Sequence, residues 1–242
     1  MGQVITDAMF AELKEEMKGA GTPEGTLEEV ERRWKEEYSK RNVISGFIKD
    51  KTIGSKRLAS MPDRVTNTIN TEGGGTKMRP TVVNCFDGEM GDLRAWWKEW
   101  KQFMFHTEIS LVGAKSTKTP FQMLVPIKHA KYPAITPEEE KISIPLQTMA
   151  LAIFDAALTH MMNTVGKSSW QRLRKELCAS LNLKKDEQII SILSSQYGNS
   201  DIVFLQETSS AFAKKAQSSA SLAKYEVMSP SMIHLPFWTA RC

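Results

Sequence analysis

Residues 201–207, which read DIVFLQE, constrain the fold more than any other segment of this 242-residue chain. Four apolar residues in a row, from Ile202 to Leu205, are typical of a short strand that is buried on both faces of a sheet. The carboxylate of Glu207 follows at the point where this strand would end. At that end of a strand, a sheet-based enzyme can hold a divalent metal ion rigidly. The segment therefore predicts a buried strand with Glu207 as a metal ligand. The alternative is an ordinary core strand that ends in an acidic residue.

The segments around DIVFLQE suggest a repeated order of helix and strand. Residues 184–197 carry apolar side chains at helical spacing, and the small polar residues after Glu207 predict a second helix. Tyr225–Met228 then predicts another strand. In this order and in the DIVFLQE motif, the chain resembles the endonuclease/exonuclease/phosphatase (DNase I-like) family. The resemblance implies Mg²⁺-dependent hydrolysis of phosphoester bonds on a sandwich of two sheets, with Glu207 binding the metal.

The same resemblance implies an earlier strand that ends in a metal-binding asparagine. Residues 79–84 read RPTVVN, so Thr81–Val83 predicts a strand and Asn84 is the candidate second Mg²⁺ ligand. The two candidate ligands are 123 positions apart (207 − 84), which requires a large helical insertion between the strands. The alternative is that Asn84 forms a turn after the strand, because asparagine readily bonds to its own backbone.

The family's catalytic His-Asp pair would lie downstream of Glu207, where this chain has only 35 further positions (242 − 207). His234 has no acidic neighbour to orient it as a base. We therefore expect a truncated relative of Mg²⁺-dependent phosphoesterases that lacks the catalytic C-terminal half. The alternative is a non-catalytic binding or assembly subunit. The expected partners are a phosphate-containing substrate and another protein chain or a second copy of this one.

The domain organisation predicted on this basis has three parts. Residues 1–50 carry apolar side chains at helical spacing and predict a helical hairpin, whose second helix would start with a capping box of Thr26 and Glu29. Residues 51–79 are polar and predict a linker. Residues 80–242 predict an incomplete α/β sandwich with a helical insertion at about 90–181. That insertion would include a buried helix from Leu146 to Val165, a strong helix start at Thr136-Pro137 and a helix at 168–179. A strand is expected at 121–127.

Three tryptophans fall at helical spacing in the segment 96–100. Aromatic residues on one face of a helix usually form core, so we expect Trp96, Trp97 and Trp100 to be buried. The alternative is a stacking surface for nucleic-acid bases, although Lys98 and Lys101 give that interpretation little positive charge.

The charge and the cysteines of the chain are those of an ordinary intracellular protein. The net charge is +4, which permits an anionic partner without requiring one. The three cysteines form no metal-binding pattern, and reduced thiols in an intracellular compartment are expected. The first residues, MGQVIT, match the pattern for N-terminal myristoylation at Gly2, which would give weak and reversible membrane contact.

Overall fold

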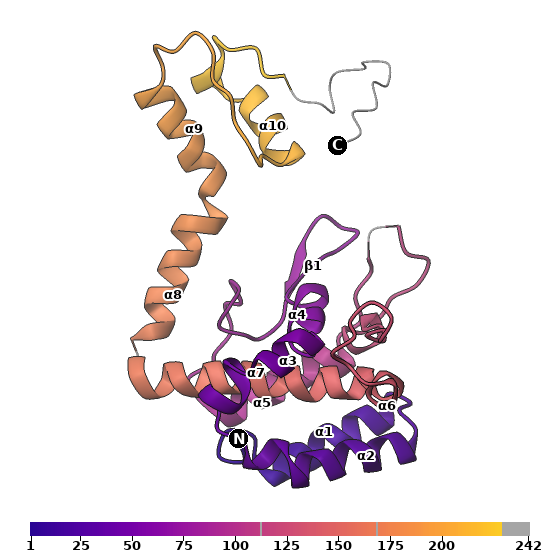
Figure 1. The fold of residues 1–242 in the computed structure, drawn as a ribbon. Helices are drawn as coiled ribbons and strands as arrows, with labels where there is room; N and C mark the ends of the chain where they lie inside the picture. The colour runs from indigo at the N-terminus through magenta and orange to yellow at the C-terminus, as the bar shows by residue number, and fades with distance from the viewer. Residues whose placement is uncertain (112, 168, 229–242) are drawn as a thin grey trace. The chain divides into compact units, whose positions relative to one another are not determined.

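The computed structural model describes residues 1–111, 113–167 and 169–228 (Figure 1). The chain divides into two compact units, Met1–Lys175 and Glu176–Cys242. Each unit has a hydrophobic core of its own. Among the described residues, no helix is long and apolar enough to span a membrane.

Helices make up most of the N-terminal unit. In chain order they are α1 (Asp7–Gly19), α2 (Glu24–Glu36), α3 (Lys51–Lys56), α4 (Ser60–Thr66), α5 (Leu93–Lys101), α6 (Pro137–Lys141), α7 (Ser143–Gly166) and α8 (Trp170–Cys178), the last of which runs into the C-terminal unit. Short 3-10 turns lie at Tyr38–Lys40 and Phe121–Met123, and π-helical turns at Ile44–Ile48 and Gln102–His106. An antiparallel hairpin joins β1 (Thr68–Asn70) to β2 (Thr76–Met78).

Helices α1 and α2 form the expected hairpin and run side by side (Figure 1). Their apolar stripes are buried against the rest of the unit, and the rings of Phe10 and Trp34 stack with centroids 4.9 Å apart. The predicted capping box at Thr26 does not form. Helix α2 begins three residues earlier, with Pro23 in the capping position, and the Glu29 carboxylate accepts hydrogen bonds from two arginines of its own helix instead.

Helix α7 is the central element of the core, as its apolar sequence predicts. Most of its residues from Ser143 to Thr159 are buried. Pro145 lies in the first turn, where a backbone N–H has no helical partner to lose. Directly before α7, α6 begins with the expected start: Thr136 and Glu139 form a reciprocal capping box, with Pro137 in the first turn. The tryptophans of α5 are also buried, which confirms their prediction as core.

The predicted α/β sandwich is wrong. Over the described residues the chain is mostly helical, and its named strands are the three-residue pair β1 and β2. None of the segments Thr81–Val83, 121–127, Ile202–Leu205 and Tyr225–Met228, which were expected to be strands, is a strand. The physical reason is that an apolar run specifies a strand only when neighbouring strands can pair with its backbone. In the described part of the chain, helices and turns precede and follow these runs, and no neighbouring strand pairs with them.

The C-terminal unit is a small helical structure. It contains the π-helical turn Ala179–Leu183, α9 (Lys185–Gln196), α10 (Ser210–Gln217) and the 3-10 turn Ala220–Leu222. Its core consists of Ile190, Phe212, Ala216 and Leu222, with Leu193, Tyr225 and Val227 partly buried beside them. Both helices were expected from the sequence. His234 and the rest of 229–242 lie outside the described residues.

A candidate binding groove over helix α1

The first predicted metal ligand, Asn84, organises a loop of the N-terminal unit. Its side-chain amide donates to the carbonyl oxygens of Asn67 (2.8 Å) and Arg79 (2.9 Å). Its side-chain oxygen accepts from the Phe86 backbone N–H at 2.9 Å. These bonds are those of a turn-forming asparagine, which was the alternative interpretation of Asn84.

The second predicted ligand, Glu207, belongs to the C-terminal unit. It is exposed, it follows no strand, and its backbone has the left-handed φ of 55°. Among the described residues, no three His, Cys, Asp or Glu side chains are grouped so that they could hold a metal ion. The Mg²⁺-binding role of Asn84 and Glu207 stays a prediction from the sequence.

The predicted lipidation site, Gly2, lies in an ordered N-terminal turn. The Gly2 N–H donates to the Ser39 carbonyl at 3.0 Å. The ammonium group of the buried Met1 donates to the carbonyls of Ser39 (3.1 Å) and Arg41 (2.6 Å). Burial lowers the pKa of this ammonium group. Acylation of Gly2 also stays a prediction.

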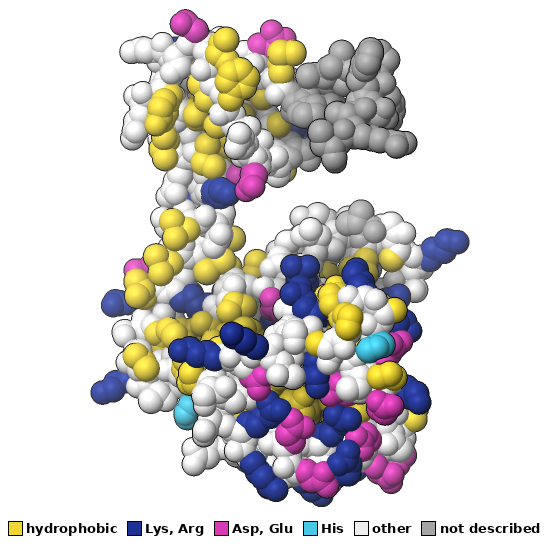
Figure 2. All heavy atoms as spheres, in the orientation of Figure 1, with side chains coloured by type: hydrophobic (Ala, Val, Ile, Leu, Met, Phe, Trp, Pro, Cys, Tyr) yellow, Lys and Arg dark blue, Asp and Glu magenta, His cyan; other side chains and the backbone are white. Residues whose placement is uncertain are grey.

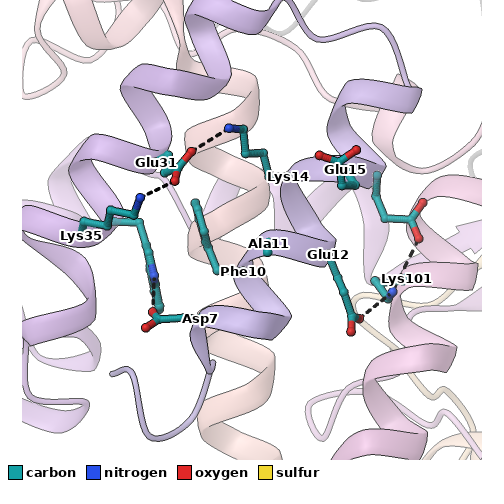
Figure 3. A pocket seen from close by; sticks show the side chains of 11 residues that line it. Asp7, Phe10, Ala11, Glu12, Lys14, Glu15, Glu31, Lys35 and Lys101 are labelled. Atoms are coloured by element: carbon teal, nitrogen blue, oxygen red, sulfur yellow. Dashed lines mark hydrogen bonds and ion pairs between the residues drawn. The ribbon is translucent and has the colours of Figure 1, made fainter.

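Charged side chains of both signs cover the face of the N-terminal unit over α1 and α2 (Figure 2). On this part of the molecule, a groove of about 800 Å³ follows α1, between α2 on one side and the end of α5 on the other. The small side chain of Ala11 lies in the middle of the groove, with Glu31 and Lys35 to one side and Glu12 and Lys101 to the other (Figure 3). Ala11 is exposed, so the floor of the groove is open to solvent.

Ion pairs hold the wall formed by α1 and α2. Lys14 donates to Glu31 at 2.6 Å, and Lys35 donates to the other carboxylate oxygen of Glu31. The hydrogen bonds from Lys14 and then Lys35 lower the pKa of Glu31 to about 2. At the same wall, the Trp34 indole N–H donates to Asp7 at 3.2 Å. The wall is therefore ionised and ordered at neutral pH.

The opposite wall joins α1 to α5. Lys101 Nζ lies 2.8 Å from one carboxylate oxygen of Glu12 and 3.7 Å from Glu16. The Trp97 indole N–H also donates to Glu12 at 2.9 Å. The hydrogen bond from Lys101 is the largest of the influences that lower the pKa of Glu12. This wall, too, is held by contacts between helices that are far apart in the sequence.

The groove carries an excess of negative charge, although the whole chain has a net charge of +4. Its lining contains three lysines (Lys14, Lys35, Lys101) and five carboxylates (Asp7, Glu12, Glu15, Glu16, Glu31), a balance of −2. Glu15 makes no hydrogen bond or ion pair to any other described residue, so its carboxylate is available to a ligand. The arrangement favours a cationic ligand.

Sequence reasoning did not find this groove. The apolar spacing in residues 1–50 predicts a helical hairpin but does not show that its charged face forms a groove, because charged residues on a helix usually face water. One signal was present: Ala11 is a small apolar residue on the charged face of α1. The contribution of Lys101, 90 positions after Ala11, could not be predicted because it depends on how α5 packs against α1.

Comparison with known proteins places most of this chain in one family. A family model, described as a domain of unknown function (DUF8234), matches residues 1–175. No curated protein and no solved structure matches the chain. The resemblance to the endonuclease/exonuclease/phosphatase family is wrong, because no model of that family matches and the sheets it implies are missing from the described residues. Residues 1–175 coincide with the N-terminal compact unit, and the chain belongs to the DUF8234 family.

Proposed function

We propose that this chain is a binding subunit of a protein assembly, and that the groove over α1 receives a basic amphipathic helix of a partner protein. The observation that carries the proposal is the combination of an exposed small residue, Ala11, with an excess of carboxylates over lysines in the whole lining of the groove. Phosphoester hydrolysis stays a prediction from the sequence, which an assay for Mg²⁺-dependent hydrolysis would test.

The shape of the groove favours a helix as the ligand. Two packed helices have axes about 8–10 Å apart, and the closer distances need small side chains at the contact. Ala11 provides such a position at the centre of the groove. A partner helix could place its apolar face over Ala11 and the edge of Phe10, which also lines the groove. Binding of an amphipathic helix in a groove is a common mode of peptide recognition.

The charges of the groove favour a basic ligand over an acidic one. The ion pairs at Glu31 and Glu12 already order the side chains of the two walls. Binding of a ligand therefore costs little conformational entropy in these side chains. A lysine or arginine of the partner can pair with the free carboxylate of Glu15. Each exposed pair of this kind contributes at most about 1 kcal/mol, so the charges mainly select the partner and speed its association.

The experiment measures the affinity of a fluorescent amphipathic peptide of leucine, lysine and alanine by anisotropy. We expect Ala11→Arg, which fills the groove with a cation, to weaken binding about tenfold. Glu15→Lys should weaken it by roughly threefold to fivefold, the range for an exposed charge. Neither change should unfold the protein, since both positions are exposed and both new residues favour helix.

The matched control is Glu28→Lys. Glu28 is exposed on α2 outside the groove and, like Glu15, makes no hydrogen bond or ion pair among the described residues. Glu28→Lys changes the net charge by the same amount as Glu15→Lys, but at a position outside the groove. It should therefore leave the affinity for the peptide within about twofold of that of the unmodified protein. If Ala11→Arg and Glu28→Lys had equal effects, the peptide would be binding elsewhere, and the proposal would fail.

A further inference from the structure

A second exposed feature lies in the C-terminal unit, within the DIVFLQE segment. The exposed fractions of its side chains alternate: 71% for Ile202, 37% for Val203, 89% for Phe204 and 44% for Leu205. Such alternation with a period of two is the pattern of a β-strand with one face toward a core. The outward face, formed by Ile202 and Phe204, is as apolar as the inward one. Hydrophobic side chains of this unit are also visible on its surface in Figure 2.

The backbone of this segment has no partner strand. In the described part of the chain, no backbone hydrogen bond involves residues 202–208, and none involves 226–228. Both segments therefore present N–H and C=O groups that bond to no other described backbone group, with apolar side chains beside them. Open edges of this kind are templates for pairing with another strand.

The two segments line the same groove, which has a volume of about 460 Å³. Helix α10 contributes Phe212 and Ala216 to its lining, and Leu193 comes from α9. The Tyr225 hydroxyl lies 3.0 Å from the Tyr197 carbonyl and 2.8 Å from the Ser200 carbonyl. These contacts tie the start of one segment to the start of the other, so the groove has an anchored end.

We propose that this groove binds an extended segment of another protein, which adds a β-strand to Ile202–Leu205. The free backbone groups call for a strand rather than a helix, because a helix has already used its own N–H and C=O groups. The inference is independent of the groove over α1, which belongs to the other unit. It adds a second surface for a partner of different conformation.

The charges beside the groove indicate that the partner strand has basic ends. Asp201, Glu226 and Lys224 line the groove, a balance of −1, and the ammonium group of Lys224 lies over the Tyr225 ring, 5.0 Å from its centroid. Glu207 follows the strand-like segment. Pairing with a second copy is disfavoured, because an antiparallel pair centred on Phe204 would place Asp201 opposite Glu207 of the other copy, and like charges repel in that position.

The experiment uses the full chain and the labelled peptide Lys-Thr-Val-Thr-Val-Thr-Val-Lys, with binding followed by anisotropy. N-methylation of alternate residues removes hydrogen-bond donors from one edge of the peptide and should weaken binding about tenfold or more. Replacing both lysines by glutamate should weaken it by roughly fivefold. Amide hydrogen exchange of residues 202–205 should slow when the unmodified peptide is bound.

Variants of the protein locate the site. Phe204→Ser should weaken peptide binding about tenfold, whereas Val165→Ser should leave it unchanged. Val165 is the matched control, because it is a large apolar residue that is 84% exposed but lies in α7. The proposal would be overturned by equal binding of the N-methylated peptide. It would also be overturned if the amides of 202–205 were already protected in the free monomer, or if light scattering showed that the chain pairs with itself.

Discussion

Arg79 and Asp155 form an ion pair inside the core of the N-terminal unit, with the guanidinium Nε 2.7 Å from a carboxylate oxygen and both side chains fully buried. Asp155 also accepts hydrogen bonds from Thr81 (2.6 Å) and from the Trp100 indole (2.8 Å). Arg79 in turn donates to Thr66 at 2.7 Å. The carboxylate on α7 therefore ties together α5, the end of α4 and the chain after β2. Burial opposes the charge on Arg79, but the ion pairs with Asp155 and Asp63 together outweigh it and raise the pKa of the guanidinium.

We expect the loss of one partner from this pair to destabilise the N-terminal unit strongly. Arg79→Met leaves the Asp155 carboxylate buried without its counter-charge, which typically costs about 3–5 kcal/mol. Unfolding in denaturant, followed by circular dichroism, would measure the loss. The double variant Arg79→Met with Asp155→Leu removes both charges and should recover part of it. If the double variant lost as much free energy of unfolding as the two single variants added together, Arg79 and Asp155 would not be coupled.

The stability of the N-terminal unit should fall in acid. Burial opposes ionisation of Glu139, but hydrogen bonds from Lys56 and the Thr136 N–H outweigh it and lower its pKa below 4.5. Hydrogen bonds from arginines lower the pKa of Glu29 to about 2, and those from lysines lower that of Glu31 to about 2. The pKa values of these three carboxylates are lower in the folded chain than in the unfolded chain. Their contribution to the free energy of unfolding is therefore complete above pH 4.5 and is lost as the pH falls toward about 2.

The variant Glu139→Gln isolates the buried member of this set. Its carboxylate side chain is only 4% exposed and lies 2.7 Å from Lys56 and 3.1 Å from Arg33. The variant should cost about 2 kcal/mol near neutral pH, and the cost should shrink as the pH falls from 4.5 toward the lowered pKa of Glu139, below which the native side chain is neutral too. Denaturant unfolding at several pH values measures both. A cost that is constant across this range would mean that Glu139 acts through its shape and not its charge.

Asn84 should prove to be a structural residue. Its side chain bonds to the backbone of Asn67, Arg79 and Phe86, so Asn84→Ala leaves these groups without their partner and should cost about 1–3 kcal/mol. Thermal unfolding in Mg²⁺ and in chelator should give the same loss. If instead the variant were destabilised only when Mg²⁺ is present, the predicted role of Asn84 as a metal ligand would be supported.

Local signals in the sequence predicted several of the helices, although α3 and α4 lie in the segment 51–79 that was expected to be a linker. The apolar spacing in 1–50 predicted α1 and α2, and the run from Leu146 to Val165 predicted the buried helix α7. The capping box at Thr136 was also predictable, because all of its atoms lie within four residues. In each of these segments, periodicity or a short motif specifies the structure without help from distant residues.

The fold class and the groove depended on contacts that no local signal shows. Ile202–Leu205 has the composition of a buried strand, yet it is exposed because no neighbouring strand covers it in the described part of the chain. The Arg79–Asp155 pair spans 76 positions, so no local pattern in the sequence indicates that Asp155 is one partner of a buried ion pair. Its role became clear only when the structure placed Thr81 and Trp100 beside it.

The boundary of the N-terminal unit depends on helix α8. The guanidinium group of Arg174, in this helix, donates hydrogen bonds to four backbone carbonyl oxygens of the loop that contains Asn84. The acceptors are Asn84 at 2.9 Å, Thr81 and Val82 at 3.3 Å, and Phe86. Trp170 is buried, and its indole donates to Asn163 of α7 at 2.8 Å. These contacts attach Trp170 and Arg174 to the N-terminal unit, and both the family match and the compact unit include them and end at residue 175.

We therefore expect residues 1–178, which include all of α8, to fold without the C-terminal unit. The core around α7 and the contacts of Arg174 and Trp170 all lie within this segment. Its thermal midpoint should lie within a few degrees of that of the full chain, as measured by circular dichroism. Residues 1–166, which lack α8, should melt at a clearly lower temperature, because Trp170 no longer covers α7 and the carbonyls of 81–86 lose their donor. Equal thermal midpoints for residues 1–178 and 1–166 would show that α8 does not belong to this unit. If residues 1–178 did not fold, the C-terminal unit would be needed to stabilise the core.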